Sequence, residues 1–109
     1  MERALRYDGL LAAVQGAGGK FETVTPEHVR EIMTYTVAHR AAGTPFDIVI
    51  DGKVPLDDPQ AAAELVGSYA AAGATWWIEA QWELGESMFA AETQAAIRER
   101  IRRGPPRMA

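Results

Sequence analysis

The fold of this chain is decided by the stretch Gly73-Ala74-Thr75-Trp76-Trp77-Ile78-Glu79-Ala80, in which a helix ends and a strand begins at once. Gly73 follows an alanine-rich segment and suits the left-handed conformation that ends many helices. The segment from Thr75 to Ala80 is too short for a helix and is rich in aromatic and β-branched residues, which favour strands. A helix, a glycine and a short strand are typical of a βα-barrel or of a doubly wound sheet, in which helical crossovers join parallel strands.

The same alternation of strand and helix is predicted in the rest of the chain, which gives three βα units. We expect a first strand over residues 10–14, a flexible glycine-rich connection over residues 16–19, and a helix that begins at Thr25-Pro26. A second strand is predicted from Phe46 to Ile50, with Phe46, Ile48 and Ile50 on one face, followed by a turn at Asp51-Gly52. The next helix begins at Asp58-Pro59. Both helix starts place a capping side chain before a proline, which fits the first helical position.

Each helix carries apolar residues at the spacing of one buried face. These residues are Val29, Ile32, Met33 and Val37 in the first helix, and Ala62, Leu65, Val66 and Tyr69 in the second. A last helix is predicted from about Ser87 to Arg103, where Gly104-Pro105-Pro106 ends it. The sequence therefore predicts an α/β fold of three parallel βα units.

Length and composition limit the size of the domain, its cellular location and its partners. The chain has 109 residues, of which 48% are hydrophobic, and we expect residues 1–109 to form a single partial βα-barrel domain. A complete βα-barrel takes about 250 residues. The absence of cysteine and of a long apolar run favours a cytoplasmic protein with no disulfide framework. The net charge of -4 favours neither nucleic acid nor a membrane as a partner.

Ligands of parallel βα folds bind beyond the carboxyl ends of the strands, where the sequence places several polar and aromatic residues. Alternation puts Trp77, Glu79 and Gln81 on one face of the third strand and Trp76 and Ile78 on the other. If the Trp76 face packs on helices, Glu79 and Gln81 point into the barrel interior. The candidates for a cofactor pocket wall are then Glu79, Gln81, Trp77, Trp82 and Asp51. The carboxylate of Glu79 has an alternative role, which is to satisfy interior polar groups. At least one of Trp76 and Trp77 packs in the core, because they face opposite ways.

A run of arginines lies at the end of the last predicted helix: Arg98, Arg100, Arg102, Arg103 and Arg107. One interpretation is a patch that binds phosphate or nucleic acid. The other is that the cations complement the helix dipole, with Glu99 placed four residues before Arg103 for an ion pair. The sequence shows neither a metal-ligand pattern nor a nucleophile motif, and no catalytic residue is identified.

Five segments together resemble the C-terminal part of the luciferase-like flavin-dependent oxidoreductases. They are Arg6-Tyr7-Asp8-Gly9-Leu10-Leu11, Thr25-Pro26-Glu27, Thr44-Pro45-Phe46-Asp47-Ile48-Val49, Gly73-Ala74-Thr75-Trp76-Trp77-Ile78-Glu79 and Ile101-Arg102-Arg103-Gly104-Pro105-Pro106-Arg107. The ordered set covers nearly the whole chain. The resemblance implies part of a (βα)8 barrel that binds reduced FMN or a deazaflavin and carries out monooxygenation or hydride transfer on a small-molecule substrate.

The family's barrel also has a large N-terminal portion, and a glycine-rich segment that binds the cofactor phosphate, without counterparts in this sequence. Residues 81–89 form a longer and more acidic insert than the family's pattern implies. One hypothesis is therefore a truncated or split enzyme completed by a chain that supplies the N-terminal half-barrel. The alternatives are a non-catalytic module that binds a second copy or another protein, since the unpaired edges of a small sheet favour strand pairing, and a remnant without a function.

Overall fold

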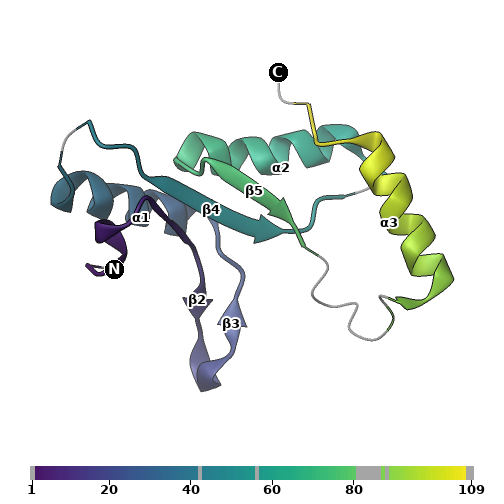
Figure 1. Cartoon of the computed structure of the whole chain (residues 1–109), viewed down its shortest axis with the longest axis horizontal. Coiled ribbons are helices and arrows are strands. Elements are labelled where there is room, and N and C mark those ends of the chain that lie inside the picture. Colours follow the sequence, from purple (N-terminus) through teal and green to yellow (C-terminus); the bar gives the residue numbers. More distant parts are fainter. Residues whose placement is uncertain (1, 42, 56, 81–86, 88, 108–109) are drawn as a thin grey trace.

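The computed structural model of this protein describes residues 2–41, 43–55, 57–80, 87 and 89–107. Figure 1 shows the arrangement of its helices and strands. In chain order these elements are η1 Ala4–Arg6, β1 Gly9–Leu11, β2 Val14–Gln15, η2 Ala17–Gly19, β3 Phe21–Glu22, α1 Pro26–His39, β4 Asp47–Gly52, α2 Pro59–Ala72, β5 Trp76–Glu79 and α3 Ala91–Arg103.

The main sheet confirms the predicted α/β class. Its strands lie in the order β1-β4-β5, and both neighbouring pairs are parallel. Helix α1 connects β1 with β4, and α2 connects β4 with β5, so helices alternate with parallel strands as expected. The strands of the described residues form an open sheet and do not close into a barrel.

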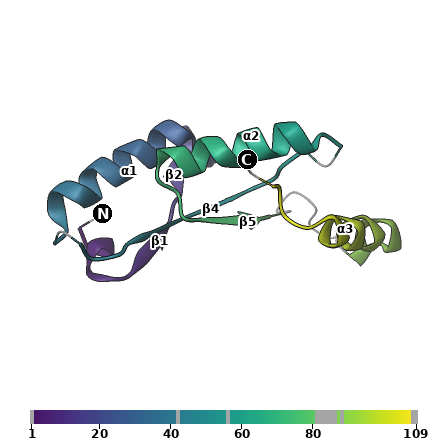
Figure 2. The ribbon, with the colours of Figure 1, turned by 90° about the horizontal axis from the view of Figure 1, so that it is seen from above.

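Both crossover helices cover the same face of this sheet (Figure 2). The core lies between them and β4, where Val29 and Ile48 have 0% of their surface exposed and Ile50 has 1%. Tyr69 of α2 joins this core and donates a hydrogen bond of 2.5 Å from its hydroxyl to the carbonyl oxygen of Val24. The face of β4 that carries Ile48 and Ile50 is therefore the face that the helices cover.

The predicted helix ends are confirmed at three places. Thr25 caps α1, because its hydroxyl accepts from the backbone N–H of His28 while the ring Nδ1 of His28 accepts from the N–H of Thr25. Asp58 caps α2, since its Oδ1 accepts from the N–H of Ala61 at 3.0 Å. Gly73 ends α2 with a φ of 124°, a conformation that favours glycine.

Residues 10–14 do not form one strand, and that prediction is wrong. The chain leaves the main sheet after Leu11 and then forms a separate antiparallel hairpin of β2 and β3. The glycine-rich residues 16–19 make the turn of this hairpin, with φ values of 72° at Gly18 and 76° at Gly19. Both of these values favour glycine, so the predicted flexible connection is an ordered turn.

Three smaller predictions are also corrected. Asp51-Gly52 is not a turn, because β4 continues to Gly52 and pairs there with Glu79. Val37 is 73% exposed, and Thr36 is buried in its place with its hydroxyl donating to the carbonyl oxygen of Ile32 at 2.8 Å. The last helix begins at Ala91 rather than near Ser87.

The second face of the main sheet carries apolar side chains that the described helices leave uncovered. The pairing register places Leu11 beside Val49 and Val49 beside Trp76, so the three share this face. The exposed fractions are 57% for Leu11, 62% for Trp76 and 48% for Ile78. Within the part of the chain that the structure describes, no helix has the length and hydrophobicity to cross a membrane.

Candidate functional site

Strand β5 presents Trp77, not Trp76, to the helices. Trp77 packs against the core, and its ring centroid lies 5.4 Å from that of Tyr69 on α2. Trp76, on the opposite face, is largely exposed. The sequence predicted Glu79 in a barrel interior on the condition that the Trp76 face packs on helices. That condition is wrong, because Trp77 and Glu79 share the face that the helices cover.

The carboxylate of Glu79 connects three parts of the chain. Its Oε1 accepts from the backbone N–H of Val54 at 3.1 Å, just after β4 ends. Its Oε2 accepts from the indole Nε1 of Trp77 at 3.1 Å and lies 3.1 Å from Nη2 of Arg100 on α3. These contacts match the alternative role weighed for Glu79, a carboxylate that satisfies interior polar groups and is paired with a cation.

Asp51, another candidate for the pocket wall, does not lie with Glu79. Asp51 lies in β4 on the open face, half-buried and paired in register with Ile78. Gln81 and Trp82 fall outside the described residues. The structure thus brings Trp77 and Glu79 together on the helix side and places Asp51 on the other side of the sheet, so the described members of the set do not line one cavity.

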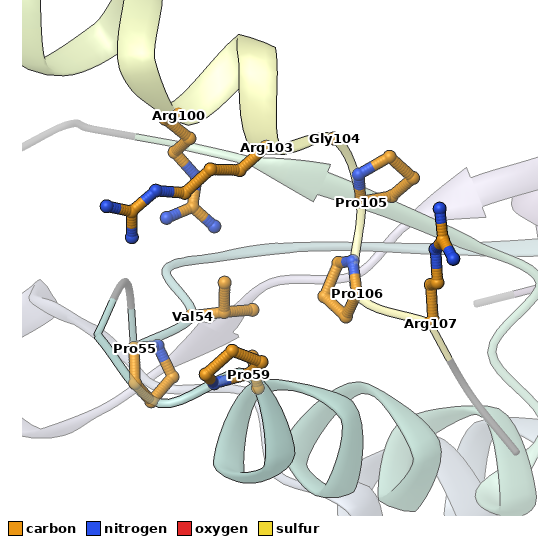
Figure 3. Close-up of a pocket in the computed structure, with 10 residues that line it drawn as sticks. Val54, Pro55, Pro59, Arg100, Arg103, Gly104, Pro105, Pro106 and Arg107 are labelled. Atoms are coloured by element: carbon orange, nitrogen blue, oxygen red, sulfur yellow. The ribbon is translucent and has the colours of Figure 1, made fainter.

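A pocket of about 460 Å³ lies between the segment after β4, the first turn of α2 and the end of α3 (Figure 3). Its lining combines a proline-rich apolar surface with guanidinium groups. The described residues that line it are Val54, Pro55, Pro59, Ala62, Arg100, Arg103, Gly104, Pro105, Pro106 and Arg107. Volumes of about 300–1,000 Å³ are usual for small-molecule sites.

Arginines give this pocket its charge. Arg100 has 16% of its side chain exposed and pairs with Glu79, whereas the more exposed Arg103 pairs through Nε with Oε1 of Glu99 at 3.3 Å. In the view of Figure 3 the guanidinium groups of Arg100 and Arg103 lie above Val54, and Arg107 lies on the other side of Pro106. Because a guanidinium carries several N–H donors in a planar fork, the contact of Arg100 with Glu79 does not use all the donors of Arg100.

Sequence reasoning identified these arginines but not the pocket. The arginine run and the Gly104-Pro105-Pro106 stop were both visible, and phosphate binding was one of the two interpretations of the run. The sequence did not predict which residues form the opposite wall of the pocket. Val54 and Pro59 lie near the middle of the sequence, far from α3 in the chain. Only the tertiary structure brings them beside α3.

The raised pKa of Tyr69 and the arrangement of metal-ligating residue types do not bear on the arginine-lined pocket. Burial raises the pKa of the Tyr69 hydroxyl, which lies in the core and not in the pocket. Within the described ranges, no three His, Cys, Asp or Glu side chains gather as metal ligands.

Comparison with protein-family models, curated proteins and solved structures finds no match to this chain.

Proposed function

We propose that this chain is part of a luciferase-like flavin-dependent oxidoreductase, in which its three βα units correspond to the C-terminal part of a (βα)8 barrel. Two features support the proposal. The family-like segments occur in the family's order along nearly the whole chain, and the three main strands are parallel with helices on one side.

The observation that carries the proposal is the open apolar face of the sheet. Parallel sheets are normally covered on both faces, yet Leu11, Trp76 and Ile78 are substantially exposed here. In a barrel the helices lie outside and the bare face points inward. Further barrel strands, from this protein or from a partner chain, would bury these side chains.

FMN or a deazaflavin would supply the redox chemistry, and the chain would contribute one wall of its pocket. On the proposed inward face, residues other than Trp77 and Glu79 would form that wall. Asp51 and Ile78, near the carboxyl ends of β4 and β5, lie on this face together with Trp76. Asp51 remains our candidate for a polar contact at the rim, and Trp76 for contact with a planar ring.

The experiment is a titration of the purified chain with FMN and, separately, with a deazaflavin, followed by cofactor fluorescence and by light-scattering mass. Saturable binding by one defined species supports the proposal, provided that Trp76→Ala weakens it. Phe21→Ala is the matched control, since Phe21 is also an exposed aromatic residue but lies on the hairpin. A folded species that binds neither cofactor would count against a cofactor wall in this chain.

A second candidate function rests on the same face and on the free edges of the sheet. β1 and β5 are the outer strands of the described sheet, and outer strands favour pairing with another chain. A non-catalytic module that assembles with a second copy would bury the open face in this way. A dimeric mass that becomes monomeric in Trp76→Glu, without cofactor binding in either protein, favours this candidate.

A further inference from the structure

We propose that the pocket between α2 and the end of α3 binds the phosphate group of a small phosphorylated molecule. The pocket lies on the helix-covered side of the sheet, because it is lined by Ala62 of α2 and by Arg100, the partner of Glu79. The flavin of the proposed function belongs to the opposite face. The phosphate site therefore does not depend on that function.

Charge is the first argument. The described residues that line the pocket include three arginines and no acidic residue. The carboxylates of Glu79 and Glu99 contact Arg100 and Arg103, so they offset part of this charge, and Arg107 adds to it. Guanidinium groups bind phosphate oxygens in a bidentate manner, and such charge-assisted hydrogen bonds are about twice as strong as neutral ones.

Pre-organisation is the second argument. Arg100 is held from one side by Glu79, whose carboxylate is itself fixed by the N–H groups of Val54 and Trp77. Arg103 follows Arg100 by one helical turn, so both project from the same face of α3. Side chains that are already ordered lose less conformational entropy when a ligand binds. The two guanidinium groups thus form a prepared surface beside the cavity (Figure 3).

The opposite wall is the third argument. Pro59 and Ala62 belong to the first turn of α2, the end of a helix that carries a partial positive charge. Asp58 accepts from one N–H of this turn and its carboxylate offsets the dipole there, so this wall contributes shape and apolar surface rather than positive charge. The remaining lining residues are mainly apolar, namely Val54, Pro55, Pro105 and Pro106. A volume of about 460 Å³ leaves room for an organic group beyond the phosphate.

A polymeric phosphate fits this site less well than a small one. The whole chain has a net charge of -4, which disfavours the extended basic surface that nucleic acid needs. Three arginines, Arg100, Arg103 and Arg107, line one concave site instead of an extended surface. We therefore commit to a small phosphate ester.

The experiment is calorimetric titration of the purified full chain, at low ionic strength, with glycerol phosphate, inorganic phosphate and a short single-stranded oligonucleotide. The expected result is saturable binding of the phosphate ester, weakened about tenfold in Arg103→Gln and also weakened in Arg107→Gln. Arg98→Gln is the matched control, because Arg98 is exposed on the same helix and does not line the pocket. Added salt should weaken binding by screening the charges.

Arg103 and Arg107 are used rather than Arg100, because the largely buried pair of Arg100 and Glu79 joins α3 to the sheet. The pair of Arg103 with Glu99 lies within α3 and is exposed. Equal affinity for inorganic phosphate would keep the phosphate site but identify the free ion as its ligand. The proposal is overturned if neither phosphate probe binds saturably, or if Arg98→Gln weakens binding as much as Arg103→Gln. Preferential binding of the oligonucleotide would also overturn it.

Discussion

Nη2 of Arg100 lies 3.1 Å from Oε2 of Glu79, and this pair joins α3 to the last residue of β5. Only 16% of the Arg100 side chain and 24% of the Glu79 side chain are exposed. The same carboxylate accepts from Val54 and Trp77. One side chain therefore links the end of β4, strand β5 and the last helix.

Replacing Glu79 by glutamine should loosen α3 from the sheet. The change leaves Arg100 half-buried without its carboxylate, and we expect the free energy of unfolding to fall by about 1–3 kcal/mol. Urea unfolding followed by tryptophan fluorescence measures this loss. Faster hydrogen exchange in α3 should accompany it. Glu99→Gln is the control, since Glu99 is 53% exposed and its pair with Arg103 contributes at most about 1 kcal/mol. Equal effects of the two changes would contradict the role given to Glu79.

Replacing Asp58 by alanine should destabilise the start of α2. The Oδ1 of Asp58 accepts from the N–H of Ala61 at 3.0 Å, and loss of such a cap costs about 1 kcal/mol. Urea unfolding again gives the measurement. The neighbouring Asp57→Ala removes the same charge but does not remove the cap residue of α2. A stability loss in Asp57→Ala as large as that in Asp58→Ala would show that charge, and not capping, is responsible.

Replacing Gly52 by alanine should disturb the packing of Trp77. A Cβ atom at residue 52 would lie 2.7 Å from Cη2 and 2.9 Å from Cζ2 of the Trp77 ring. The ring has to move away from its place beside Tyr69, and overpacking of this kind costs about 1–3 kcal/mol. The expected result is a lower midpoint in urea together with a changed tryptophan emission maximum. An unchanged stability would mean that the ring adapts freely at this position.

Replacing Tyr69 by phenylalanine should change how stability depends on alkaline pH. Burial raises the pKa of the Tyr69 hydroxyl above its ordinary value of 10.0. As the pH rises above about 10, the unfolded chain loses this proton before the folded chain does, so the free energy of unfolding falls until the pH passes the folded pKa.

Tyr69→Phe removes this contribution to the fall of the free energy of unfolding at alkaline pH. It should also cost about 1–3 kcal/mol near neutral pH, because the carbonyl oxygen of Val24 loses its donor. Urea unfolding at a series of pH values tests both effects. Tyr7→Phe serves as the control, since Tyr7 is 61% exposed. A pH dependence that is the same in Tyr69→Phe and in the wild type would contradict the assignment.

The sequence by itself determined the parts of this fold that depend on near neighbours in the chain. Thr25-Pro26 and Asp58-Pro59 start helices because a capping side chain acts on N–H groups within three residues. Gly73 ends α2 because its backbone conformation disfavours any other residue. The alternating pattern of β4 likewise predicted correctly that Ile48 and Ile50 share one face, and the structure shows that this face is buried.

Only the tertiary structure decided which face of β5 is covered. Both faces carry a tryptophan, so alternation alone does not distinguish them, and burial follows from Tyr69 on α2 meeting Trp77. The same holds for Thr36, which is buried in place of Val37 because of where α1 rests on the sheet.

The arginine pocket has the same origin, since Arg100 and Val54 meet through Glu79 and are far apart in the chain. Capping and turn preferences act over a few residues and can be read locally. Burial and charge pairing depend on residues that only folding brings together.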